Sequence, residues 1–167
     1  MEGTYFKERV EDYLNTTLEE QEVVDAINDC LFAIGDRALN YSEITILVDD
    51  SNVGKWIKPE ESVTAIIRAF DDNGRETNKW STRATEFKFD EEGTYKVEVR
   101  LMPEPISSIS DEVDIHPLFN HAILCYLKGY FKLRDDDSSI DGQRLMQEWQ
   151  TWLEWAYQTL KKARTNE

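Results

Sequence analysis

The densest cluster of side chains that could bind a metal ion lies near the C-terminus, between two apolar segments. It reads RDDDSSIDG over residues 134–142, and it has the first spacings of a calcium-binding EF-hand loop that would begin at Asp135. The sixth position of that loop is Ile140 instead of glycine, and the twelfth is Met146 instead of glutamate. Because calcium geometry depends on those two positions, we expect no metal site here. The sequence instead predicts an exposed interhelical loop whose Ser and Asp side chains cap the next helix.

Two histidines and two cysteines are the remaining candidates for catalysis or metal binding. His121 and Cys125 lie four residues apart on one predicted helix and could form half of a metal site, but no second pair at ligand spacing exists. His116 precedes Pro117 and is expected to cap a helix. There is no glycine-rich phosphate loop and no nucleophile motif. We therefore expect no catalytic residue, no metal and no cofactor, and hence no enzyme.

Three of the five tryptophans lie on the last long segment and bear on partner binding. Trp149 and Trp152 fit an apolar stripe with Leu145 and Leu160, whereas Trp155 falls off that stripe. Exposed tryptophans are enriched in interfaces. The sequence thus predicts Trp152 in the core and Trp155 at an interface, with a broader buried face as the alternative.

Basic residues follow this segment at the C-terminal end of an acidic chain. Lys161, Lys162 and Arg164 would complement the dipole of the preceding helix. Their clustering also suggests a second role, so we take them, with Trp155, as candidate partner-binding residues. We expect residues 161–167 to be disordered or frayed in the free protein.

Helical periodicity surrounds a central region of alternating periodicity. Residues 4–14 and 18–39 are predicted helices, the second opened by a capping box at Thr17-Leu18-Glu19-Glu20. Residues 116–160 predict an antiparallel pair of helices joined by the acidic loop, and Pro117 suits a first helical position.

Four runs between these helices alternate in polarity with period two, as strands do. They lie at residues 44–48, 63–70, 85–90 and 95–101, with a turn at Asn73-Gly74 and a three-residue hairpin expected at residues 91–93. A sheet with one solvent-exposed face and one buried face is typical of antiparallel pairing. The predicted fold class is α+β: a helical bundle of about four helices from residues 1–41 and 112–167, with an inserted antiparallel β-sheet domain over residues 42–111.

Composition limits the classes of function. The chain has 167 residues, of which 40% are hydrophobic, and a net charge of −15. This charge disfavours direct binding to nucleic acid or to anionic membranes. No apolar run is long enough to span a membrane, and the N-terminus has no signal-peptide pattern. Cys30 and Cys125 lie within apolar helical patterns, so we expect two reduced thiols in the core.

The order of these segments resembles the head-to-tail adaptor (connector) proteins of tailed bacteriophages. An acidic helix pair is followed by a β insertion, a proline-rich return (Pro103-Glu104-Pro105), a helix opening His116-Pro117, and the end Tyr130 to Asp137 before a long terminal helix. The architecture covers the whole chain, and the motifs cover about residues 112–157.

The resemblance implies a virion structural protein in the neck between capsid and tail, assembled in the host cytoplasm. Such a protein forms a ring, commonly of twelve subunits, beneath the portal protein, meets a tail or nozzle protein, and continues the channel for DNA packaging and ejection. DNA would pass without specific binding, and no membrane is involved. In that family the terminal segment commonly engages the portal. A soluble interaction or tail-completion module with no enzymatic activity is the main alternative, and a metal-dependent hydrolase built on the Asp-rich loop is a third.

Overall fold

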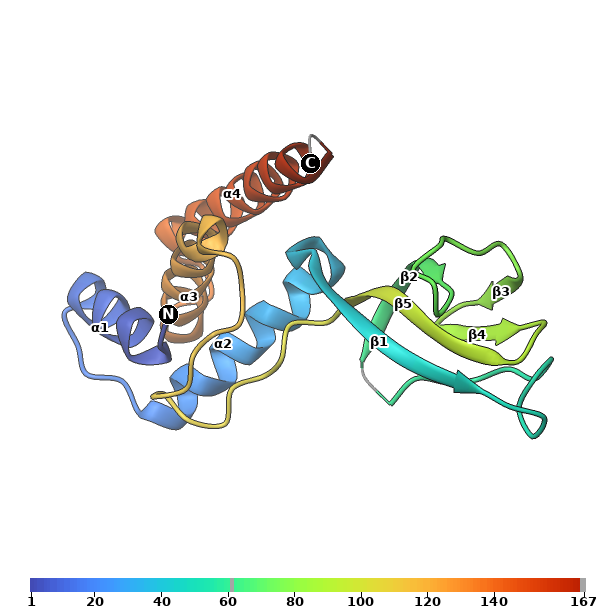
Figure 1. Ribbon diagram of the computed structural model, residues 1–167. Helices are drawn as coiled ribbons and strands as arrows, with labels where there is room; N and C mark the ends of the chain where they lie inside the picture. Colours follow the sequence, from blue (N-terminus) through green and yellow to red (C-terminus); the bar gives the residue numbers. More distant parts are fainter. Residues whose placement is uncertain (61, 166–167) are drawn as a thin grey trace. The chain divides into compact units, whose positions relative to one another are not determined.

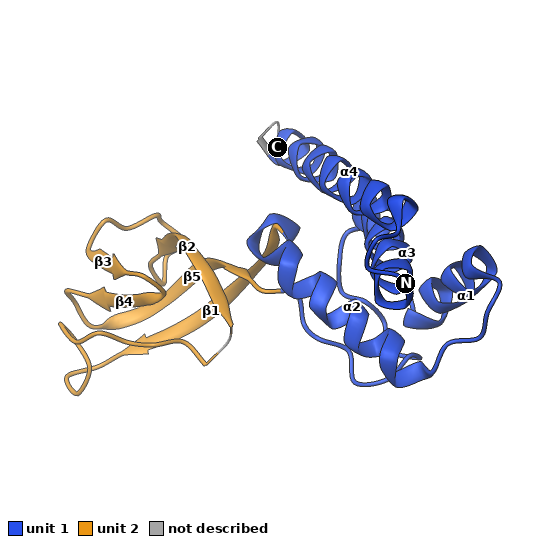
Figure 2. Ribbon diagram, turned by 180° about the vertical axis from the view of Figure 1, so that it is seen from behind, with its two compact units in different colours: residues 1–38, 103–167 blue, residues 39–102 orange. Residues whose placement is uncertain are grey.

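The chain folds into two compact units, one helical and one built of antiparallel strands (Figure 2). The computed structural model describes residues 1–60 and 62–165. Residues 1–38 and 103–167 form the helical unit, and residues 39–102 form the β unit. The fold is therefore α+β with an inserted antiparallel β domain, as the sequence predicts.

The C-terminal boundary of the insertion differs from the expected residue 111 because the return segment packs on the helical unit. Ile106 and Ile109 are buried there, and the side chain of Asn28 bonds both main-chain groups of Ile106, at 2.8 and 2.9 Å. The amides of Gly3 and Thr4 donate to Asp111 and Ile109 at 3.1 and 2.8 Å. These hydrogen bonds pair main-chain groups of a segment that has no regular secondary structure. Residues 103–111 therefore belong to the helical unit.

Over residues 1–38 and 103–165, the helical unit contains four α-helices (Figure 1): α1 (Gly3–Leu14), α2 (Glu20–Ile34), α3 (Asn120–Asp135) and α4 (Ile140–Thr165). Short 3-10 helices follow α2 (Gly35–Ala38) and precede α3 (Pro117–Phe119). Each α-helix buries one apolar stripe, as an amphipathic helix in a bundle must. The largest fully buried side chains of this unit are Phe6, Phe119, Phe131, Ile27, Leu31, Ile34, Ile123, Leu127, Leu153 and Val10.

The start of α2 departs from the predicted capping box. The N-cap residue is Glu19, and it makes no side-chain cap bond. The amide of Leu18 instead binds the carboxylate of Glu11 at 2.8 Å, and this bond is the main cause of the lowered pKa of Glu11. The helix ends at Gly35, whose φ of 55° a residue without a Cβ adopts at little cost.

Helices α3 and α4 form the predicted hairpin, and a glycine lets them approach closely. A Cβ added at Gly129 would lie 2.9 Å from the Met146 sulfur and 3.2 Å from the Leu145 Cβ. The hairpin opens as expected at His116, whose Nδ1 accepts the amide of Leu118 at 3.2 Å.

The described residues of the β unit form five strands in two sheets: β1 (Asn40–Val48), β2 (Val63–Phe70), β3 (Trp80–Arg83), β4 (Glu86–Phe89) and β5 (Gly93–Leu101). Strand β5 is central in a three-stranded sheet of order β1-β5-β2, and β3 pairs with β4. All pairings are antiparallel. The predicted turn at Asn73-Gly74 is confirmed by the bond from the Gly74 amide to the Asp71 carbonyl, 2.9 Å long.

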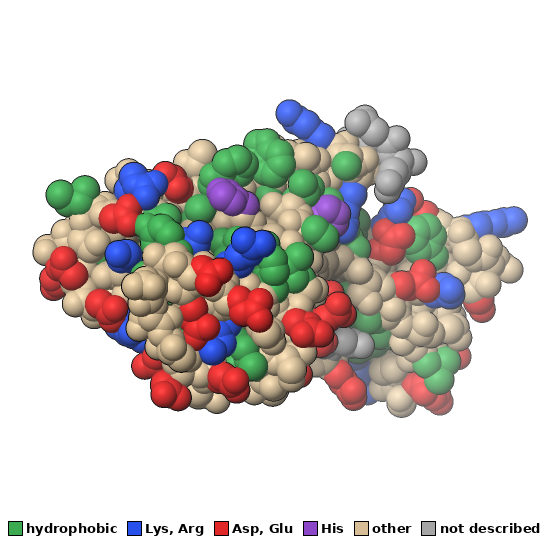
Figure 3. All heavy atoms as spheres, turned by 90° about the vertical axis from the view of Figure 1, so that its left-hand side faces the viewer, with side chains coloured by type: hydrophobic (Ala, Val, Ile, Leu, Met, Phe, Trp, Pro, Cys, Tyr) green, Lys and Arg blue, Asp and Glu red, His purple; other side chains and the backbone are tan. Residues whose placement is uncertain are grey.

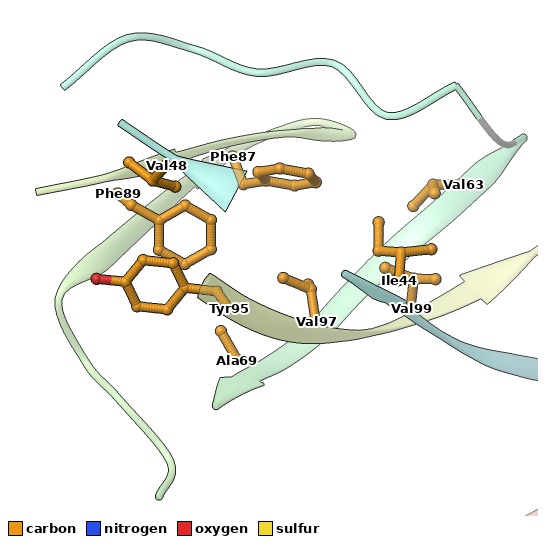
Figure 4. Close-up of a cluster of buried hydrophobic side chains, with 9 residues drawn as sticks. All are labelled: Ile44, Val48, Val63, Ala69, Phe87, Phe89, Tyr95, Val97 and Val99. Atoms are coloured by element: carbon orange, nitrogen blue, oxygen red, sulfur yellow. The ribbon is translucent and has the colours of Figure 1, made fainter. Parts of the chain in front are cut away.

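The expected hairpin between β4 and β5 is wrong, because β4 pairs with β3 through the turn at Ala84 and Thr85. Strand β4 faces β5 through side chains instead. Phe89 stacks on Tyr95 with ring centroids 4.0 Å apart. Figure 4 shows the resulting core, in which the aromatic rings lie with Val48 toward one end, and Ile44, Val63 and Val99 gather at the other.

Candidate partner-binding surface

The Asp-rich loop between α3 and α4 is a structural turn. The amide and hydroxyl of Ser138 both donate to the Asp136 carboxylate, at 3.0 and 2.7 Å, and these bonds lower the pKa of Asp136. The hydroxyl of Ser139 accepts the amide of Gly142 at 3.2 Å and so caps α4, as the sequence predicts. In the described part of the chain, no three His, Cys, Asp or Glu side chains are grouped so that they could hold a metal ion.

The first turn of α4 is also bound to α1, a contact that the sequence did not reveal. The hydroxyl of Tyr13 donates to Asp141, which Arg144 also binds, and these two hydrogen bonds lower the pKa of Asp141. The ammonium groups of Lys128 and Lys132 lie 4.7 and 5.7 Å from the centre of the Tyr13 ring. Tyr13 thus connects α1 to both helices of the hairpin.

The two thiols do not belong to a site. Cys30 and Cys125 are buried and free, as predicted. Burial raises the pKa of both thiols, most strongly that of Cys30, so they remain protonated and unreactive at neutral pH. His121 does not pair with Cys125 in a ligand set; its ring is exposed and packs against Trp152.

The exposed aromatic side chains of α4 form the most distinctive surface of the helical unit. Trp152 and Trp155 are 37% and 48% exposed, and their rings meet edge to face with centroids 5.6 Å apart. His121 of α3 lies against Trp152 at 4.5 Å, again edge to face. We call these three residues the α4 aromatic patch. Figure 3 shows hydrophobic side chains gathered beside the histidines, with acidic side chains on the same face.

The prediction for Trp155 as an exposed residue is confirmed, and the prediction of Trp152 as a core residue is wrong. The buried stripe of α4 runs through Leu145, Leu153, Ala156 and Leu160. Trp152 precedes Leu153 by one residue, which on an α-helix is a rotation of about 100°. This rotation turns Trp152 out of the core and toward Trp155.

Trp149 is half-buried, between the buried stripe of α4 and its exposed face. Its ring packs edge to face on Tyr126 at 4.9 Å, and its indole nitrogen is buried without a hydrogen-bond partner among the described residues. Burial raises the pKa of Tyr126 to about 12, so this phenol stays protonated. The contact between Tyr126 of α3 and Trp149 of α4 is therefore aromatic and uncharged.

The cationic residues at the end of α4 lie on an ordered helix. Residues 161–165 continue α4, so the expected disorder is wrong for them; residues 166 and 167 lie outside the described part of the chain. Lys162 follows Trp155 by seven residues, which places it within about 20° of the same helix face. Lys161 lies 5.7 Å from the Tyr157 ring centre, and Arg164 falls on the side opposite Trp155. Only Lys162 therefore extends the patch.

No protein-family model matches this chain, and no curated protein matches it. Within the described residues, no helix is both long and apolar enough to cross a membrane. The function must accordingly be argued from the surface itself.

Proposed function

We propose that this protein is a head-to-tail adaptor of a tailed bacteriophage. It would assemble into a ring, with twelve subunits expected, beneath the portal protein, and would join the head to a tail or nozzle protein. It would carry out no reaction. In this proposal DNA passes through the ring without specific binding.

The observation that carries the proposal is the α4 aromatic patch. Two indoles that remain 37% and 48% exposed on one helix are the kind of residue that dominates the buried centre of protein interfaces. Their rings are already held by each other and by His121, so little conformational entropy is lost when a partner covers them. Lys162, two turns further along, adds a charged rim.

The architecture and the charge support the choice of an adaptor. The order of two helices, an antiparallel β insertion and a His-Pro-opened helical hairpin is the order in which the sequence resembles that family. The chain has 34 acidic and 19 basic residues. An acidic wall repels the phosphate backbone, so DNA can slide along it without adhesion.

The α4 aromatic patch also fits a single contact in a soluble interaction or tail-completion module, which is the second candidate. Light scattering coupled to size exclusion, with and without the portal protein of the same virus, separates the two. The adaptor proposal expects a complex in which many copies of this chain bind one portal ring, visible as a stacked ring by negative-stain microscopy. A chain that stays monomeric with the portal, or binds another protein one to one, would exclude the adaptor.

A further inference from the structure

The two edges of the three-stranded sheet in the β unit are unequally protected. On the β2 edge, the register with β5 shifts twice, and the turn that follows folds back so that the Thr77 amide bonds the Ala69 carbonyl at 2.9 Å. Strand β1 pairs with β5 in unbroken register from Asn40 to Val48 and has one charged residue, Glu43. Bulges, prolines and charges are the usual means by which a sheet edge avoids pairing with other chains. Strand β1 therefore lacks the protection that β2 has.

The outward main-chain groups of β1 can be identified from its neighbours. The side chain of Asn52 donates to the Leu47 carbonyl at 3.0 Å and accepts the Asp49 amide at 2.9 Å, which places both groups on the side away from β5. In a strand, the main-chain amide and carbonyl of every second residue point to the same side. The main-chain groups of Glu43 and Thr45 therefore also point away from β5. In the part of the chain that the structure describes, the amides and carbonyls of Glu43 and Thr45 have no hydrogen-bond partner.

The pairing of β5 supports this assignment independently. The Met102 amide bonds the Ser62 carbonyl at 3.0 Å, and the Arg100 carbonyl accepts the Thr64 hydroxyl at 3.2 Å. The main-chain amides and carbonyls of the even-numbered residues of β5 thus face β2, and those of the odd-numbered residues face β1. Val97 is odd-numbered, so its main-chain groups face β1, and it lies opposite Ile44. The main-chain groups of the even-numbered residues of β1 therefore face β5, and those of the odd-numbered residues face outward.

A groove of about 350 Å³ runs along this outward edge. One wall is β1 from Ile44 to Leu47, and the other is the segment from Ile57 to Glu60. Ile57 exchanges two main-chain bonds with Phe87 of β4, at 2.7 and 3.0 Å, so the next residue, Lys58, directs its main-chain groups away from β4. A strand occupies roughly 3.3 by 4.8 by 10 Å per residue, so the groove holds about two residues of one strand.

We propose that this β1 groove binds a single extended peptide segment of a partner protein by strand addition. The segment would bond to Thr45 of β1 on one side and to Lys58 on the other. The second wall excludes the sheet edge of another copy of this chain, because that edge would already be paired on its far side. The inference stands on the β unit alone and does not depend on the adaptor proposal.

The lining of the groove specifies the chemistry of the segment. Ile46 and Ile57 are half-buried and favour apolar side chains at alternate positions of the segment, since successive side chains of a strand point to opposite faces. Lys58 and Glu60 contribute opposite charges to the groove. The β unit, residues 39–102, has 13 acidic and 9 basic residues, and its net charge of −4 favours a cationic segment at long range. The partner segment is accordingly extended, alternately apolar, and basic.

The test uses the full chain and the synthetic peptide Lys-Val-Thr-Val-Lys-Val-Thr-Val-Lys, with binding followed by calorimetry and by the amide NMR spectrum. Two matched peptides carry N-methyl groups on one edge, or glutamate in place of lysine. The matched protein variants are Thr45→Pro, which removes an outward amide without touching the β1–β5 bonds, and Thr45→Val, which keeps that amide.

The proposal expects the lysine peptide to shift the amides of Thr45 and Lys58. Binding should weaken by about tenfold or more with Thr45→Pro or with the N-methylated peptide, and stay nearly unchanged with Thr45→Val. The glutamate peptide should bind more weakly at low salt. N-methylation tests the same hydrogen bonds even if Thr45→Pro fails to fold. No binding up to about 1 mM, equal binding of the N-methylated or glutamate peptide, or dimerisation of this chain through β1 would overturn the proposal.

Discussion

Replacing Trp155 with alanine tests whether the α4 aromatic patch is the surface on which this chain assembles. A tryptophan side chain contributes up to ~250 Å² of contact area. Because Trp155 is 48% exposed, roughly 120 Å² is left for a partner to cover. At ~25 cal/mol per Å², that area corresponds to ~3 kcal/mol of association free energy. We therefore expect Trp155→Ala to weaken the complex with the portal by about a hundredfold.

The stability of the isolated chain should change much less. Trp155→Ala removes the edge-to-face pair with Trp152, which is worth ~0.5–1.5 kcal/mol. For a chain of this length, each kcal/mol lost from the free energy of unfolding should lower the melting temperature by about 2–4 °C. Leu153→Ala, two residues before Trp155 and only 1% exposed, should instead cost ~2–5 kcal/mol by leaving a cavity.

Thermal unfolding of the isolated chain and co-sedimentation with the portal protein measure the two effects separately. Ile140→Ala is the matched control for assembly, because Ile140 is 84% exposed on the same helix but lies at its other end, away from the patch. If Trp155→Ala assembles as well as the unmodified chain, or if Ile140→Ala weakens assembly equally, the patch is not the binding surface. An equal loss of stability in Trp155→Ala and Leu153→Ala would refute the assignment of the helix face.

Three further changes test the fold. Gly129→Val should cost ~1–3 kcal/mol in the free energy of unfolding, measured by urea denaturation, because its side chain would meet Met146 and Leu145. Asp141→Asn should lower the melting temperature slightly at about pH 7. This difference should shrink as the pH falls below about 4, because a carboxylate with a lowered folded pKa contributes stability only while it is ionised. Replacing residues 39–102 with a short Gly/Ser linker should leave a folded helical unit by circular dichroism, since Asn40 and Leu101 are paired and the ends of the insertion are adjacent; an unfolded product would show that the units are not separable.

The strands were predictable from sequence wherever one face of the sheet is buried. The alternation in β1, β2, β4 and β5 follows from that burial, and it located all four. Strand β3 has a single large apolar residue, Trp80, and so shows no alternation. Its absence from the prediction left β4 without a partner, and β4 was paired with β5 instead. Pairing depends on contacts that local polarity does not encode.

Hydrogen bonds in the loop and at the helix caps were predictable where both partners are close in sequence, and unpredictable where they are far apart. His116 and Ser139 act through main-chain amides two and three residues away, so their roles follow from local sequence. A capping box was expected at residues 17–20, but the N-cap is Glu19 without a side-chain bond, and the Leu18 amide binds Glu11 in the preceding helix. Tyr13 and Asp141, 128 positions apart in the chain, meet only because α1 packs on α3, which in turn packs on α4. Contacts of this kind require the tertiary structure.

The exposed face of α4 was ambiguous for a specific geometric reason. A stripe through residues 145, 149, 152, 156 and 160 has steps of three and four residues, and so does the stripe that passes through Leu153 instead of Trp152. Periodicity alone cannot separate two faces that differ by one residue when both candidates are apolar. Residue size can, because leucine is often fully buried whereas tryptophan rarely is. That preference places Leu153 in the core and both indoles at the surface, which is the arrangement from which the α4 aromatic patch, and with it the proposed interface, arises.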